Sequence, residues 1–406
     1  MAWNLVGKAL IGQSGGPTAV INQSLVGAVR QAYEHKEFIT RFYGAKHGVR
    51  GILKEDFIDL YAQDPQTLDA VAETPSAALG SVRHKVTADE CKQVFEICKK
   101  NDIRYFFYIG GNDSAETAHL INQLGREAGY ELRLIHIPKT IDNDLKVTDH
   151  CPGYGSAAKF VAQAFMGDDL DNRSINGIKI NIVMGRHAGF LTAASALGRK
   201  FEDDGPHLIY VPEVNFSMEK FLKDVEDCYA RLGRCIVAVS EGVSEDGEPV
   251  ASKFLKEVDS HGNVQLSGSG ALGDYLAEAV KKHMTAKLGK EPRIRADTFG
   301  YLQRCFPGIV SEVDAKEAYE VGRAGVRFAL SGDVDGSAVI KRLKGEVYRV
   351  EYELAALEDL AKYTKSMPPE FINASGNDVT QAFIDYALPL IGKLPVKGRL
   401  NNIGPK

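Results

Sequence analysis

The chain has 406 residues, of which 44% are hydrophobic and 25% are charged, and its formal net charge is −5. This composition is that of a core-forming globular protein of two or three packed units, and it excludes the disordered, collagen-like and disulfide-scaffold classes. Because acidic residues outnumber basic ones, no excess of positive charge exists to drive general binding to nucleic acid or to an anionic membrane.

Short apolar runs that end at glycine-rich turns and lead into helical patterns recur along the chain. This order of strand, loop and helix is typical of parallel α/β architecture. The three clearest units are Lys8–Ile11 into Gly12–Asn22, Tyr105–Ile109 into Gly110–Leu120, and Lys179–Met184 into Gly185–Leu197. Further strands are predicted at Phe38–Tyr43, Leu132–Ile137, Leu208–Val211 and Cys235–Val239, and helices at Glu90–Lys100, Tyr275–Leu288 and Asp314–Leu330. Together the strands need at least one sheet, and we expect two.

The first glycine-rich turn, residues 12–17, reads G-Q-S-G-G-P and separates a predicted strand from a helix expected to begin near Ala19. Glycine lets backbone N–H groups approach an anion closely, and the N-terminus of the following helix adds partial positive charge. The turn is neither a Walker sequence nor G-x-G-x-x-G. On these residues alone, a phosphate site and a plain tight turn are equally good interpretations.

Two later loops, 110–114 and 138–144, directly follow predicted strands. Open α/β sheets bind ligands at the carboxyl ends of their strands, so we expect these loops to lie near each other. In the second loop a lysine, Lys139, precedes the carboxylates of Asp142 and Asp144 by a few positions. Acid, base and phosphate-binding charge are therefore concentrated in one loop. The structural alternative is an Asx-rich turn capped by its own side chains.

At this point the chain resembles the phosphofructokinase family. The resemblance rests on five blocks in the family's order: S-G-G-P at 14–17, G-G-N-D-S at 110–114, P-K-T-I-D-N-D at 138–144, M-G-R-H-A-G at 184–189 and G-Y-L-Q-R at 300–304. It implies an α/β fold of two three-layer α/β/α sandwich domains, with the chain crossing between them. Residues 1–155 with 305–360 would form the donor-binding domain, and residues 156–304 with 361–406 the sugar-phosphate-binding domain.

The resemblance also implies phosphoryl transfer to the 1-hydroxyl of fructose 6-phosphate, a reversible step of glycolysis and gluconeogenesis. Asp142 would be the base, with Thr140 and Arg186 also catalytic, because such transfer needs a proton acceptor, positioning and charge neutralisation. Asp113 and Asp144 would hold Mg²⁺. Donor phosphates are expected at Gly15, Gly16, Ser81, Arg83, Gly111, Asp113, Ser114 and Lys139, and the sugar phosphate at Thr140, Asp142, Asp144, Met184, Gly185, Arg186, Glu241, Arg295, Tyr301 and Arg304.

Departures from the family pattern bear on the donor. ATP-dependent relatives have G-G-D-G-S where this chain has G-G-N-D-S, and glycine where it has Lys139. The side chain of Asp113 would take space that a nucleotide needs, and Lys139 would offer a cation to a small, highly charged donor. Both features resemble the pyrophosphate-dependent branch, so we expect pyrophosphate as the donor. Asn112 replaces an aspartate that usually helps to bind magnesium, which leaves the direct metal ligands open.

Two other functions stay open. An ATP-dependent 6-phosphofructokinase would share every block except the substituted positions. A non-catalytic subunit that binds sugar phosphate for regulation would be expected to lack Asp142 or Arg186, and both are present. Relatives often have an arginine where this chain has Gly177, and Lys179 or Arg173 is the candidate to replace it.

The six cysteines show no spacing typical of a metal site or a disulfide framework. Residues 1–10 lack a basic segment followed by a long apolar stretch, and no run approaches the roughly 20 apolar residues of a membrane helix. We therefore expect a cytoplasmic protein that does not span a membrane. The resemblance further implies a homo-oligomer, a dimer or tetramer, whose subunits lend each other substrate-binding residues.

Overall fold

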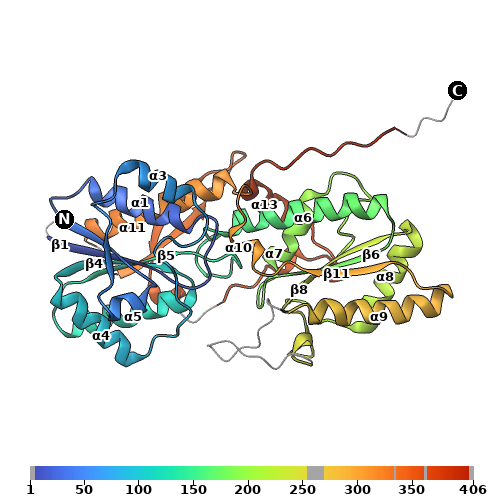
Figure 1. The fold of residues 1–406 in the computed structure, drawn as a ribbon, viewed down its shortest axis with the longest axis horizontal. Coiled ribbons are helices and arrows are strands. Elements are labelled where there is room, and N and C mark those ends of the chain that lie inside the picture. Colours follow the sequence, from blue (N-terminus) through green and yellow to red (C-terminus); the bar gives the residue numbers. More distant parts are fainter. Residues whose placement is uncertain (1–4, 254–268, 333–334, 361–363, 402–406) are drawn as a thin grey trace.

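The computed structural model describes residues 5–253, 269–332, 335–360 and 364–401. Two α/β units lie side by side, each built around its own sheet (Figure 1). The seven-stranded sheet of the first unit has the order β13-β12-β5-β4-β1-β2-β3 and is parallel except at its two edges. Its strands are β1 (Gly7–Gln13), β2 (Ile39–Ala45), β3 (Phe57–Asp59), β4 (Ile103–Gly110), β5 (Arg133–Pro138), β12 (Asp335–Arg342) and β13 (Val350–Ala355).

The four-stranded sheet of the second unit has the order β11-β6-β8-β7, and all its pairs are parallel. A short antiparallel hairpin follows β8 in the sequence. The strands of this unit are β6 (Ile178–Val183), β7 (Leu208–Tyr210), β8 (Cys235–Ser240) and β11 (Ile294–Thr298), with β9 (Ser244–Glu245) and β10 (Glu248–Pro249) in the hairpin.

Helices cover both faces of the first sheet because its central strands are apolar on both sides. Along β4, Tyr105 and Phe107 belong to one buried cluster, whereas Phe106 and Tyr108 belong to another. Successive side chains of a strand point to opposite faces, so these two clusters fill the two sides of the sheet. One side is covered by α1 (Ile21–Tyr33) and α11 (Glu312–Ser331), the other by α4 (Ala88–Lys100) and α5 (Asn112–Glu127).

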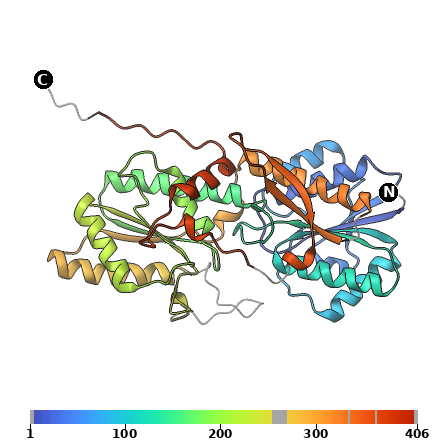
Figure 2. The same cartoon turned by 180° about the vertical axis from the view of Figure 1, so that it is seen from behind.

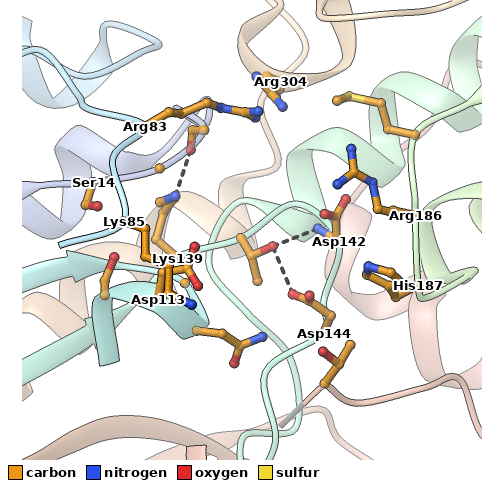
Figure 3. Close-up of a pocket in the computed structure, with 18 of the residues that line it drawn as sticks. Ser14, Arg83, Lys85, Asp113, Lys139, Asp142, Asp144, Arg186, His187 and Arg304 are labelled. Atoms are coloured by element: carbon orange, nitrogen blue, oxygen red, sulfur yellow. Dashed lines mark hydrogen bonds between the residues drawn. The ribbon is translucent and has the colours of Figure 1, made fainter. Parts of the chain in front are cut away.

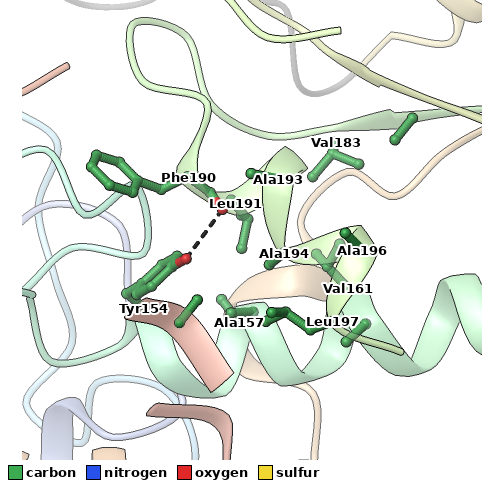
Figure 4. Close-up of a cluster of buried hydrophobic side chains, with 14 of the residues drawn as sticks. Tyr154, Ala157, Val161, Val183, Phe190, Leu191, Ala193, Ala194, Ala196 and Leu197 are labelled. Atoms are coloured by element: carbon green, nitrogen blue, oxygen red, sulfur yellow. Dashed lines mark hydrogen bonds between the residues drawn. The ribbon is translucent and has the colours of Figure 1, made fainter. Parts of the chain in front are cut away.

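The second sheet is covered in the same way, so each unit has three layers. One face carries α6 (Tyr154–Ser174), α7 (Phe190–Ala193) and α13 (Gln381–Ile391), the other α8 (Met218–Leu232) and α9 (Ala271–Leu288). Figure 4 shows the small and aliphatic side chains of the first face packed between α6 and the segment 190–197. The remaining short elements are α2 (Val49–Leu53), α3 (Pro65–Glu73), α10 (Leu302–Cys305), α12 (Leu357–Leu360), η1 (Ala194–Gly198), η2 (Val250–Lys253) and η3 (Pro369–Phe371).

The predicted α/β architecture with two sheets is confirmed. Every predicted strand is present, as are the three helices predicted apart from the strand–loop–helix units, and the ends of these elements differ from the prediction by a few residues. The helix expected near Ala19 begins at Ile21, and the helical pattern to Leu197 is split between α7 and η1. The assignment of 1–155 with 305–360 and of 156–304 with 361–406 to two domains stays a prediction. All six cysteines are free thiols. None of the described helices is long and apolar enough to cross a membrane.

Candidate active site

The loops that follow parallel strands of both sheets meet around one cavity of about 530 Å³ (Figure 3). From the first sheet come the turn after β1, the N-terminus of α5 after β4, and the loop 139–144 after β5. From the second sheet come residues 184–187 after β6 and Glu241 after β8. Parallel strands gather their carboxyl ends at one edge, and here two such edges enclose the same space.

Most of the predicted site residues line this cavity. Figure 3 shows Lys85, Asp113 and Lys139 on one side and Arg186 and His187 on the other, with Asp142 and Asp144 between them. The structure therefore brings the expected donor loops and the expected base to one place. The predicted residues in the lining are Gly15, Gly16, Arg83, Gly111, Asp113, Ser114, Lys139, Thr140, Asp142, Asp144, Met184, Arg186, Glu241 and Arg304.

Two further predicted residues support the lining from behind. The Ser81 hydroxyl donates to the carbonyl oxygen of Gly15 at 2.6 Å and so holds the first glycine turn. Gly185 has a φ of 135°, and a Cβ there would lie 2.6 Å from the carbonyl oxygen of Ala188. Only glycine fits that turn, which allows Met184 and Arg186 on either side of it to line the cavity.

Arg295 and Tyr301, also predicted to bind the sugar phosphate, lie outside the described lining of the cavity. Arg295 is exposed on β11, an edge strand, in register with Lys179 of β6. Tyr301 is 50% exposed, and the guanidinium of Arg304 lies over its ring, 4.7 Å from the centroid. Within one copy of the chain, the segment 295–304 therefore delivers only Arg304 to the cavity.

Two carboxylates of the cavity, Asp142 and Asp144, have raised pKa values. Burial, reinforced by the nearby charges of Asp144 and Glu241, raises the pKa of Asp142 to about 7. Burial also raises the pKa of Asp144, although Thr140 donates a hydrogen bond to that carboxylate at 3.2 Å. The same Thr140 hydroxyl accepts from the backbone N–H of Asp142 at 3.1 Å, which ties the two acidic residues together. A carboxylate with a pKa near neutrality is well suited to accept a proton.

Positive charge balances this acidic group. Among the described residues, five Lys or Arg side chains and four carboxylates line the cavity. Lys139 is buried, and its ammonium group donates to the carbonyl oxygen of Gly16 at 2.7 Å. Burial, together with Arg304 and Arg83, lowers its pKa to about 8. Such a concentration of cations beside backbone turns suits a small anion with several negative charges.

The cavity is also lined by residues that were not predicted from the sequence to belong to the site. Lys85 comes two positions after Arg83, and His187 stands inside the M-G-R-H-A-G block, so local signals for both existed. Burial, together with Arg186, lowers the pKa of His187. Thr364 also lines the cavity and pairs with Leu145 through an isolated β-bridge. Thr364 reaches the cavity because a segment far along the chain folds back onto Leu145, and no local sequence motif marks such a contact.

Comparisons with known proteins agree with this arrangement. The family model described as Phosphofructokinase matches residues 8–329, and the chain belongs to the phosphofructokinase family. It is 54% identical over 390 residues to the pyrophosphate–fructose 6-phosphate 1-phosphotransferase of Rhodospirillum rubrum, covering 95% of each chain. It is 37% identical to the protein of the same name from Halomonas elongata, covering 95% of this chain and 91% of that one. The solved pyrophosphate-dependent phosphofructokinase of Marinobacter aquaeolei superimposes with a TM-score of 0.83 at 35% identity, over 98% of this chain and 95% of that one.

Proposed function

We propose that this member of the phosphofructokinase family transfers a phosphoryl group from pyrophosphate to the 1-hydroxyl of fructose 6-phosphate. The observation that carries the proposal is one cavity in which Asp142, with a pKa near 7, lies among cations that include the buried Lys139. The names of the similar proteins support the same reaction and the same donor.

Different residues of the cavity have different roles in the proposed reaction. Asp142 accepts the proton of the sugar hydroxyl as its oxygen attacks a phosphorus atom of pyrophosphate. The bond from that phosphorus to the bridging oxygen breaks, so fructose 1,6-bisphosphate and orthophosphate are formed. Arg186, whose guanidinium stays charged and can bind two oxygens, stabilises the phosphoryl group in transit. Because the donor anhydride and the product are close in phosphoryl-transfer potential, the step runs in both directions.

Two side chains favour pyrophosphate over a nucleotide. Asp113 stands in the first turn of α5 and lines the cavity, where a glycine would leave room for an α-phosphate and ribose. Lys139 places an ammonium group beside the carbonyl oxygen of Gly16, at the first glycine turn. A small donor has no adenosine contacts, so it depends more on such a cation than ATP does.

The carboxylates that line the cavity fit a divalent cation. Mg²⁺ prefers oxygen ligands and is commonly held by one or two carboxylates together with substrate phosphates. Asp113 and Asp144 both offer such oxygens to the cavity and would hold the ion. When bound, Mg²⁺ would offset the negative charge of the pyrophosphate oxygens. Thr140, through its hydrogen bond to Asp144, would orient that carboxylate.

We also infer a homo-oligomer, a dimer or tetramer, in which Arg295 serves the cavity of a neighbouring copy. Its exposed place on an edge strand, outside the cavity of its own copy, supports this arrangement. Lys179 lies in register with Arg295 and pairs with Asp297, and Arg173 pairs with Asp203 and Asp204. Both candidates for the arginine that relatives have at position 177 are thus engaged within this copy of the chain. Free cysteines are typical of reducing compartments and favour a cytoplasmic location.

A donor comparison tests the proposal. We would measure kcat/KM with pyrophosphate and with ATP, at matched Mg²⁺, for the parent protein, Asp113→Gly, Lys139→Gly and the double variant. The parent should prefer pyrophosphate, Asp113→Gly should raise ATP-dependent activity, and Lys139→Gly should mainly depress the use of pyrophosphate. The double variant should shift furthest toward ATP. A parent that prefers ATP would contradict the choice of donor, and a parent inactive with both donors would contradict the enzymatic function.

A further inference from the structure

Asn143 separates the two acidic residues of the cavity but does not itself line it. Asp142 and Asp144 both do, whereas Asn143 is fully buried. Its backbone is left-handed, with a φ of 58°. Asparagine tolerates this conformation better than most residues. Both neighbouring carboxylates thus line the cavity, whereas the amide of Asn143 is buried away from it.

The buried amide of Asn143 is anchored at both of its polar atoms. Its Oδ1 accepts from the backbone N–H of Cys151 at 3.0 Å, and its Nδ2 donates to the hydroxyl oxygen of Tyr386 at 2.8 Å. The Tyr386 hydroxyl in turn donates to the carbonyl oxygen of Asp149 at 2.9 Å. Two sets of hydrogen bonds therefore join the start of the loop 142–151 to its end: one runs directly from Asn143 to Cys151, and the other runs from Asn143 to Asp149 through Tyr386, which is far away in the sequence.

Tyr386 is held firmly from several directions. It belongs to α13, which packs against α11 of the first unit and α6 of the second at the junction of the two units (Figure 2). Arg342 of β12 donates to the Tyr386 carbonyl oxygen at 2.9 Å and lies over its ring, 4.8 Å from the centroid. The rings of Phe371 and Phe190 pack at 5.2 and 6.0 Å. Burial raises the pKa of Tyr386, so its hydroxyl stays protonated and remains a donor to Asp149.

We propose that Asn143 and Tyr386 form a positioning pair, which sets the direction in which Asp142 and Asp144 enter the cavity. The inference rests on the phosphoryl transfer proposed above. Neither residue touches the reactants, so both act through the carboxylates. A displacement of about 1 Å at a reacting group can cost about 100-fold in rate, so loss of this anchor should be visible in kcat.

Tyr386→Phe is the sharpest test because it removes one hydroxyl and keeps the ring in its aromatic surroundings. We expect kcat to fall by about 10-fold or more while KM for each substrate changes by less than about 3-fold, since transition-state alignment is lost and ground-state binding is not. Peptides that cover residues 142–151 should exchange their amide hydrogens faster, because the Cys151 amide depends on Asn143. Asn143→Gly permits the same backbone angle but removes both hydrogen bonds, and it should lower kcat further.

Adding Tyr386→Phe to Asn143→Gly should then cost clearly less than Tyr386→Phe costs alone, since the contact with Asn143 is already absent and only the bond to the Asp149 carbonyl oxygen remains to be lost. Tyr130→Phe is the matched control. Its hydroxyl donates to the carbonyl oxygen of Ile103 at 2.9 Å, in a part of the first unit away from the cavity, so kcat should stay at the parental value. Parental kcat and parental exchange in Tyr386→Phe, or losses that multiply in the double variant, would overturn the pair. A parent without pyrophosphate-dependent turnover would instead overturn the proposed function, and the exchange measurement would still decide whether Tyr386 orders the loop.

Discussion

Asp142 is partly buried next to Asp144 and Glu241, and it is the residue on which the proposed chemistry most depends. Its pKa of about 7 lies well above the ordinary value of 3.8, chiefly because burial disfavours the charged form. The residue must be ionised to accept a proton. The parent kcat/KM for fructose 6-phosphate should therefore rise as the pH increases through about 7 and level off above it.

Asp142→Asn should keep the shape of the side chain and remove the proton acceptor. We expect kcat to fall by about 10²–10⁴-fold, with a much smaller change in KM, and the residual activity should lose the rise near pH 7. Steady-state kinetics between pH 5.5 and about 9 would check both statements, since that range brackets the expected transition. A variant with near-parental kcat, or one that keeps the same pH profile, would remove Asp142 from the role of base.

At the scale of elements, the sequence was most informative where a strand ends in a glycine-rich turn. Such turns follow β1, β4 and β6, and each of them contributes to the cavity. The long helix α6 was missed because small and apolar residues are buried around much of its surface, so it has no clear polar face. The hairpin of β12 and β13 was missed as well, although residues 350–354 of β13 alternate apolar and polar residues as a partly exposed edge strand does.

The close packing of helix α1 against helix α11 was also not predicted from local sequence patterns. Two glycines make the crossing close: a Cβ at Gly322 would lie 2.1 Å from the carbonyl oxygen of Ser24, and one at Gly27 would lie 2.1 Å from that of Tyr319. The glycine turn of the cavity precedes α1 directly. The distance between these helices therefore also bears on the position of Gly15 and Gly16.

Gly322→Ala should force the two helices apart. We expect it to lower the free energy of unfolding by about 1–3 kcal/mol, the usual cost of overpacking a core. Gly167→Ala is the matched control, since Gly167 is an exposed position of α6 where a Cβ meets nothing within 4 Å. That change should stabilise the protein by about 0.5–1 kcal/mol. Denaturant unfolding of both variants would check the signs, and a Gly322→Ala protein as stable as its parent would contradict the close crossing.

At the scale of the whole molecule, the cavity forms because the carboxyl ends of two sheets face each other. Sequence spacing predicted that the loops after β4 and β5 would lie near each other, and the structure adds the turn after β1, the next strand of the same parallel sheet. No spacing rule predicted that Glu241 and Arg186 of the other unit would face them, and that expectation came from the family resemblance. Thr364 had no signal of either kind. Contacts between units depend on how the units dock, which local sequence patterns do not encode.

The two arginines of the segment 295–304 lie in different surroundings. Arg304 lines the cavity of its own copy together with Asp142, whereas Arg295 is exposed on the edge strand β11. If Arg295 serves a neighbouring copy, a subunit with Arg295→Ala can still supply an intact Asp142 to its own site. A subunit with Asp142→Asn can still supply an intact Arg295 to its neighbour.

Oligomers assembled at random from Arg295→Ala and Asp142→Asn subunits should therefore recover activity, although each variant alone is impaired. When the two subunits are equal in number, about one site in four of the unselected mixture, and about one site in two of a doubly tagged dimer, should receive both intact residues, and activity at low fructose 6-phosphate should approach that fraction of the parental value. Arg304→Ala is the matched control, because mixing it with Asp142→Asn leaves every site without one of two residues that belong to the same copy. Coexpression with two affinity tags and kinetics on the doubly tagged oligomer would decide the matter. Activity no higher than the mean of the separate variants would place Arg295 outside any neighbouring site.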